Sequence, residues 1–214
     1  MAKGHRSVKY YYEELAKEIL TLFICRDFNL LKMSDKPDLQ SDELSCGIEV
    51  VEGISSQNGL ENAYIRLTFN TNMTFKERIN KGTAMKVTDF AELKEIDGAF
   101  VLENRINNVE SLKKEIIAKI NQKSEKIANY KQFKENDLFV FCNDEYELSD
   151  IKDIVSKLAD QQKFNQIFFS CTEYIIAYIS KTNDFYERFY HENESYYKML
   201  KKLKKKYGIS KNKD

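Results

Sequence analysis

The feature that most constrains the fold is an acidic residue inside a short apolar strand. Residues 46–51 read Cys-Gly-Ile-Glu-Val-Val, with Glu49 in the middle. Successive side chains of a strand point to opposite faces, so Ile48 and Val50 share one face while Glu49 and Val51 share the other. Apolar residues on both faces are typical of a strand that is buried on both sides. A buried carboxylate needs a partner, a proton or a metal ion, which makes Glu49 a candidate functional residue.

The chain's single proline stands shortly before this strand and brings a second acid with it. Pro37 favours an extended conformation in the residue before it, so Lys36-Pro37-Asp38 predicts the entry to a strand. The polar residues 41–45 are few enough to join two antiparallel strands. Such a hairpin would bring Asp38 close to Glu49, where one metal ion could bind both carboxylates. The alternative is a glutamate at a sheet edge beside a solvated aspartate in a turn.

Pro37-Asp38, followed by Gly47-Ile48-Glu49-Val50, resembles the PD-(D/E)xK nuclease superfamily, which has the restriction-endonuclease-like fold. The resemblance implies that Asp38 and Glu49 are catalytic ligands of a divalent metal ion, Mg²⁺ or Mn²⁺. It also implies that a glutamate of the first helix reaches the metal, and Glu14 is the candidate for that position.

The same family places a lysine two residues after the glutamate, where it orients or activates the attacking water. That position is Val51 in this chain, and valine can do neither. Some members of the family place the lysine, or a glutamine, elsewhere. Three residues are candidates for the missing function: Gln40, Lys36 and Gln57.

The order of predicted elements extends the resemblance to much of the chain. A helix over residues 8–23 precedes strands around residues 24–33, 37–40 and 46–52, and a long helix covers residues 111–130. An apolar strand at 138–142, a helix at 149–160 and strands at 167–170 and 174–179 follow. Strand, helix, strand in this order predicts a parallel pair. We therefore expect an α/β fold, with a mixed β-sheet flanked by helices in a restriction-endonuclease-like core.

The length of 214 residues fits one domain with an insertion. We assign residues 1–183 to a single nuclease-like domain, with a helical insertion at about 70–107. A helical, basic C-terminal tail over 184–214 completes the chain.

Contacts with nucleic acid would have to come from local patches, because 34 basic and 34 acidic residues cancel. Arg66, in a helix predicted over residues 60–67, could pair with a phosphate, although a surface salt bridge is the plainer interpretation. The densest cluster lies in the tail, where lysines alternate with tyrosines. Its candidate contacts are Lys201, Lys202, Lys204 and Lys205. Further lysines, including Lys123, are expected on the solvated outer face of the helix at 111–130.

Other kinds of site and location are disfavoured by the sequence. Four cysteines without a CxxC pair, and two histidines near opposite ends, argue against a zinc site or a Cys-His nucleophile. Met1 to Tyr10 has no secretory apolar segment, and no apolar run has the length of a membrane span. We expect a cytoplasmic protein that does not associate with membranes.

Two functional hypotheses follow. The first is a magnesium-dependent nuclease that hydrolyses phosphodiester bonds in nucleic acid, using Asp38 and Glu49. The second is a nuclease fold without activity that binds nucleic acid or protein, which the missing lysine favours. The placement of the two carboxylates, and of a lysine or glutamine beside them, discriminates between these hypotheses. Nucleases that cut both strands often act as dimers, so the resemblance is also compatible with a homodimer.

Overall fold

The structure is a computed structural model of the chain. It describes residues 3–24, 27–52, 74, 76–77, 80, 91–96, 99–104, 109–142, 146–158, 162–191 and 193–208. The chain divides into two compact units, one formed by residues 1–53 with 116–214 and the other by residues 54–115. The elements are, in order, α1 (Lys3–Phe23), η1 (Phe28–Leu30), β1 (Lys32–Met33), β2 (Leu39–Ser41), β3 (Cys46–Glu52), β4 (Ala91–Ile96), β5 (Ala99–Asn104), α4 (Val109–Lys126), η3 (Ile127–Asn129), β6 (Glu135–Phe141), α5 (Leu148–Ser156), β7 (Gln166–Ser170), β8 (Tyr174–Ile179), β9 (Asp184–Phe189) and α6 (Glu194–Lys206).

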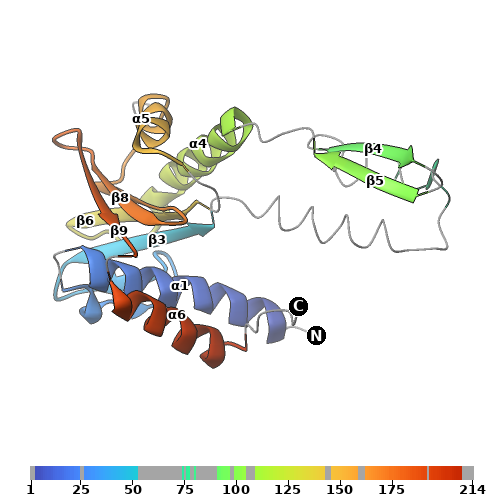
Figure 1. Cartoon of the computed structure of the whole chain (residues 1–214). Helices are drawn as coiled ribbons and strands as arrows, with labels where there is room; N and C mark the ends of the chain where they lie inside the picture. Colours follow the sequence, from blue (N-terminus) through green and yellow to red (C-terminus); the bar gives the residue numbers. More distant parts are fainter. Residues whose placement is uncertain are drawn as a thin grey trace. The chain divides into compact units, whose positions relative to one another are not determined.

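The first unit is built on a mixed sheet whose seven described strands run in the order β1-β2-β3-β6-β7-β8-β9 (Figure 1). Strands β1, β2 and β3 form an antiparallel meander, β6 lies parallel to β3, and β7 lies parallel to β6. Strands β8 and β9 continue the sheet in antiparallel fashion. The expected α/β fold with a mixed sheet flanked by helices is therefore confirmed, including the parallel pair joined through α5.

Helices cover both faces of this sheet because its central strands are apolar on both sides. Alternate side chains such as Ile48, Phe139 and Phe168 pack into one core with α1 and α6, which lie side by side (Figure 1). The intervening side chains, such as Leu138 and Ile167, are also fully buried, and α4 and α5 lie on their side of the sheet. Burying each large apolar side chain stabilises the fold by about 1.5–3 kcal/mol, so this two-faced core is the main source of stability.

The C-terminal segment differs from the expected helical tail in its first part. Residues 184–189 form β9, an edge strand that pairs with β8 through the turn at Asn183, which has a φ of 57°. Along β9, exposed and half-buried side chains alternate, which is the period of a strand and not of a helix. The prediction of a helix from Asp184 was therefore wrong, whereas the later helix is present as α6, capped by Asn193.

The second unit contains a β-hairpin where we expected a helical insertion. Strands β4 and β5 pair antiparallel, with Leu93 opposite Leu102. Residues 99–102 form a continuous apolar run, Ala-Phe-Val-Leu, whose length suits a strand, and this segment pairs with the strand just before it in the chain. The helix predicted over residues 60–67 lies outside the described residues.

Candidate active site

The two acids of the sequence motif are held together by the β2–β3 hairpin. In this hairpin Leu39 pairs with Ile48. Asp38 comes just before Leu39 and Glu49 just after Ile48, so the antiparallel register places the two acids next to each other. The Asp38 carboxylate accepts a hydrogen bond from the backbone N–H of Val50 at 2.9 Å, which ties it to the strand that carries Glu49. Both acidic residues are buried, with exposures of 5% and 4%. The hairpin therefore brings Asp38 and Glu49 together, as the spacing predicts.

Gly47 allows the turn before β2 to pack against β3. A Cβ atom on Gly47 would lie 2.6 Å from both Pro37 Cγ and Phe133 Cδ2. Real Cβ atoms do not approach neighbours so closely, so only glycine fits at this position without rearrangement. The close approach holds Pro37, and with it Asp38, on the strand that contributes Glu49.

The acid that α1 contributes is Glu13 and not Glu14. Glu13 is 1% exposed, and the charge of Asp38 acts on its carboxylate. Glu14, on a neighbouring face of the helix, instead forms an ion pair with Lys206 at 2.6 Å and accepts a hydrogen bond from the Tyr207 hydroxyl. Consecutive residues of a helix are rotated by about 100°, which separates the two glutamates.

The sequence does contain a signal for Glu13. Glu13 precedes Ala16 by three residues and Leu20 by seven, and both are fully buried. This i, i+3, i+7 spacing places Glu13 on the buried face of α1. An acid on the core-facing side of a helix is a stronger candidate for a functional site than an acid on a neighbouring face.

Lys9 lies one turn before Glu13 and contacts two of the three acids. Its Nζ is 3.1 Å from Asp38 Oδ1 and 3.3 Å from Glu13 Oε1. The second contact lacks hydrogen-bond geometry, and neither Glu13 oxygen has a hydrogen-bond partner among the described residues. Burial, together with the Asp38 charge, raises the pKa of Glu13 to about 7 against the opposing effect of Lys9.

Lys123 of α4 reaches Glu49 from the other side of the site. Its ammonium group donates a hydrogen bond to Glu49 Oε1, and the Tyr130 hydroxyl lies 3.4 Å from the same oxygen. We expected Lys123 on a solvated outer face, and its side chain is in fact turned towards the sheet. Burial alone would lower the pKa of Lys123, but the contact with Glu49 outweighs it and the pKa is raised.

The second oxygen of Glu49, Oε2, is buried and has no hydrogen-bond partner among the described residues. Burial, and then the charge of Asp38, raise the pKa of Glu49 despite the opposing effect of Lys123. The charge of Asp38 therefore acts on both Glu13 and Glu49, and we call these three acids the carboxylate cluster. Glu13, Asp38 and Lys123 line a small cavity of about 190 Å³ at this place.

The sequence-based substitutes for the missing lysine have other contacts. The Gln40 amide donates hydrogen bonds to the backbone carbonyls of Pro37 at 2.9 Å and Asp35 at 3.4 Å. It therefore holds the turn that precedes β2. Lys36 is exposed in that turn with a φ of 58°. Gln57 and Arg66 lie outside the described residues.

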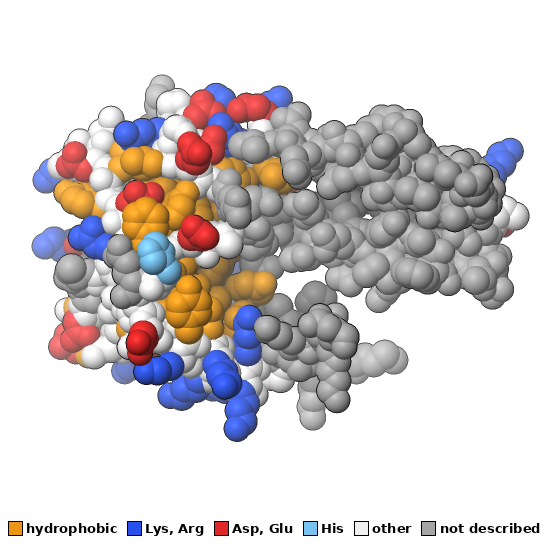
Figure 2. Space-filling view, viewed as in Figure 1, with side chains coloured by type: hydrophobic (Ala, Val, Ile, Leu, Met, Phe, Trp, Pro, Cys, Tyr) orange, Lys and Arg blue, Asp and Glu red, His pale blue; other side chains and the backbone are white. Residues whose placement is uncertain are grey.

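The lysines of the C-terminal segment lie along α6. Met199 and Leu203 are the buried residues of this helix. The candidate contacts with nucleic acid, Lys201, Lys202, Lys204 and Lys205, are all exposed. In Figure 2, Lys and Arg side chains gather along the lower border of the view, where Figure 1 draws α6.

A second group of side chains could also hold a metal ion. Cys46, Glu135 and Asp137 stand at the beginnings of the paired strands β3 and β6, and each offers a ligand atom within 4.8 Å of the others. The Cys46 thiol lies 3.6 Å from Asp137 Oδ2, and the other oxygen of Asp137 accepts the backbone N–H of Gln166 at 3.1 Å. The sequence carries no local signal for this group, because the two acids are about ninety positions from Cys46.

None of the described helices has both the length and the apolar composition that a membrane span requires. Comparison with known proteins found no matching family model, no matching curated protein and no matching solved structure.

Proposed function

We propose that this protein is a metal-dependent nuclease, which hydrolyses phosphodiester bonds in nucleic acid. The observation that carries the proposal is the carboxylate cluster beside Lys123. Three acids from α1, the β2 entry and β3 meet a half-buried lysine from α4. The PD-(D/E)xK resemblance requires these kinds of residue, and the helix followed by a three-stranded meander supports it further.

The carboxylate cluster fits a divalent metal ion with oxygen ligands. Glu13 has two buried oxygens without hydrogen-bond partners among the described residues, and Glu49 has one. Each of these two acids is paired with one lysine, so its burial is only partly compensated, and a cation that binds the remaining oxygens would reduce the cost further. Carboxylate oxygens suit Mg²⁺ and Mn²⁺, which are the ions we propose.

A bound Mg²⁺ ion would lower the pKa of water and stabilise negative charge on the leaving oxygen. Glu13, Asp38 and Glu49 are its proposed ligands. Lys123 supplies the positive charge that Val51 cannot. Because Glu49 raises the pKa of Lys123, the ammonium group stays protonated at neutral pH. In this state it can donate a hydrogen bond to water or phosphate.

The first experiment is calorimetric titration of Mg²⁺ and Mn²⁺ into the wild type and into Glu49→Ala. We expect binding by the wild type that is lost in Glu49→Ala. Asp137→Asn is the matched control, because it removes an acid from the other candidate group. Binding that survives in Glu49→Ala and disappears in Asp137→Asn would move the metal to that second group and contradict the proposal.

Cleavage is then measured on labelled single-stranded DNA, double-stranded DNA and RNA. We expect Mg²⁺-dependent cleavage of at least one substrate, with a loss of at least about 100-fold in Lys123→Met and partial retention in Lys123→Arg. Cleavage at the wild-type rate by Lys123→Met would refute the proposed part of Lys123 in the reaction.

The alternative is a nuclease-like fold that binds nucleic acid or protein without cleaving it. Lys9 favours it, because one lysine already balances part of the charge of Glu13 and Asp38. In that case the wild type binds neither metal ion, and nucleic acid is bound without being cleaved.

A further inference from the structure

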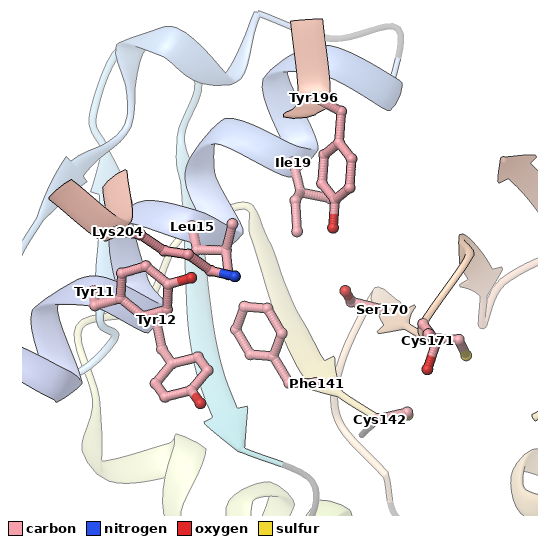
Figure 3. Close-up of a pocket in the computed structure, with 11 residues that line it drawn as sticks. Tyr11, Tyr12, Leu15, Ile19, Phe141, Cys142, Ser170, Cys171, Tyr196 and Lys204 are labelled. Carbon is pink, nitrogen blue, oxygen red and sulfur yellow. The ribbon is translucent and has the colours of Figure 1, made fainter. Parts of the chain in front are cut away.

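A cavity of about 490 Å³, which we call the aromatic cavity, shares Tyr12 with the small cavity at the carboxylate cluster. It opens where β6 and β7 end, between those strand ends and the helices α1 and α6 (Figure 3). Its volume is within the range of about 300–1,000 Å³ that is usual for small-molecule pockets. The carboxyl ends of neighbouring parallel strands are a common place for ligands in α/β folds.

Aromatic rings and one cation distinguish the walls of this cavity. Tyr12 and Phe141 face each other in the close-up, with ring centroids 5.2 Å apart and an edge-to-face arrangement (Figure 3). Tyr196 lies along the wall that α6 contributes, and Lys204 reaches the cavity from the same helix. Ser170 lies on the strand side, where its hydroxyl and that of Tyr190 share a hydrogen bond of 2.7 Å.

The aromatic cavity adjoins the carboxylate cluster. Tyr12 lines both the aromatic cavity and the smaller cavity that Glu13 and Asp38 line. Phe141 pairs in register with Glu52, three residues beyond Glu49 on β3. Tyr12 is therefore a wall residue of both cavities, and the end of β6 lies beside the end of the strand that carries Glu49.

We infer that the aromatic cavity binds one unpaired nucleobase of a single-stranded substrate, and that Lys204 contacts the adjacent phosphate. The inference rests on the proposed function and names its substrate class. All four bases can stack on aromatic side chains, and a lysine beside the rings can pair with a phosphate of the nucleic-acid backbone. A base within a duplex is stacked and paired, so a base that enters the cavity has to come from a single strand.

The test uses fluorescent five-nucleotide strands of DNA and of RNA, with binding measured by anisotropy in EDTA. One series carries an abasic nucleotide at each position in turn, which removes a base and keeps every phosphate. We expect one position at which base removal weakens binding to the wild type by at least about tenfold. In Tyr12→Leu the intact strand is weakened to a similar extent, and the abasic substitution then has less than a twofold effect.

Further variants separate stacking, charge and folding. Tyr12→Phe keeps the ring and retains wild-type binding, while Tyr186→Leu removes an exposed tyrosine from β9 and has no effect. Lys204→Gln alters an exposed side chain, so it keeps the fold and weakens binding several-fold. Lys181→Gln, in the turn before β9, is its charge-matched control and leaves binding unchanged.

Three outcomes overturn the inference. These are an absence of binding to either strand, an abasic series without position dependence, and a Tyr12→Leu variant that still discriminates the abasic strand. The result is independent of the metal titration, because it is obtained in EDTA. If the protein recognises the base but binds no metal ion, the aromatic cavity is a nucleic-acid site and the nuclease proposal fails. If it binds the metal ion but does not recognise the base, only the inference about the aromatic cavity fails.

Discussion

Replacing Glu13 with glutamine tests the central physical claim about the carboxylate cluster, which is that a buried acid is held there at a cost. The pKa of Glu13 is raised from 4.5 to about 7. A raised pKa in the folded state means that stability is fully present below the unfolded pKa and is lost as pH rises through the folded pKa. Wild-type stability should therefore fall between about pH 4.5 and pH 7 because of this group.

The size of this fall follows from the two pKa values. One pKa unit corresponds to about 1.36 kcal/mol, so Glu13 removes about 3 kcal/mol of stability above pH 7. About 2.5 kcal/mol of this loss falls between pH 5 and pH 8. Glu13→Gln cannot ionise and does not show the loss, while Lys9 keeps its contact with Asp38. The free energy of unfolding of the variant relative to the wild type should increase by that amount between the two pH values.

Urea denaturation of both proteins at pH 5 and pH 8, in EDTA, measures this change. Comparing the two proteins cancels the titration of groups that they share. Glu14→Gln is the matched control from the next position. Although burial opposes it, Lys206 and Tyr207 lower the pKa of Glu14, so its stabilising effect is present at high pH and lost as pH falls. Because this loss occurs below about pH 4.5, the stability of Glu14→Gln relative to the wild type should hardly change between pH 5 and pH 8, unlike that of Glu13→Gln.

A difference between Glu13→Gln and the wild type that is the same at both pH values would refute the reasoning. It would mean that Glu13 has an ordinary pKa, and the argument for a cation at the carboxylate cluster would lose its main support.

Three further predictions concern packing, a buried hydrogen bond and the lysine of the site. Gly47→Ala places a Cβ 2.6 Å from a Phe133 ring carbon and should cost about 1–3 kcal/mol in urea denaturation, so an unchanged midpoint would contradict the packing. Tyr190→Phe breaks the 2.7 Å hydrogen bond with Ser170 and should cost about 1 kcal/mol. Adding Ser170→Ala should recover part of that loss, and a further loss of similar size would show that the two hydroxyls act independently. Lys123→Met should weaken the protein less at pH 5 than at pH 8, because the carboxylate it contacts has a raised pKa; equal losses at both pH values would contradict this.

Much of the architecture could be predicted from local sequence patterns. The apolar run that became β6 and the helical periodicity of α1 each specify their own element, since a period of two or of about 3.6 residues is a local property. Errors arose where two periods were compatible with one segment. Residues 184–189 contain aromatic side chains at spacings that suit either element, and pairing with β8 decided in favour of a strand.

The site divides in the same way. The sequence alone determined Asp38 and Glu49, because a proline turn, a polar loop of five residues and an apolar strand with one acid fix a local hairpin. Glu13 and Lys123 depended on the tertiary structure. Whether a helical side chain points towards a site depends on how its helix is rotated and packed against the sheet, and residues 74 positions apart, such as Glu49 and Lys123, meet only in the folded chain. The buried oxygens without partners, and hence the argument for a cation, arise from that long-range packing.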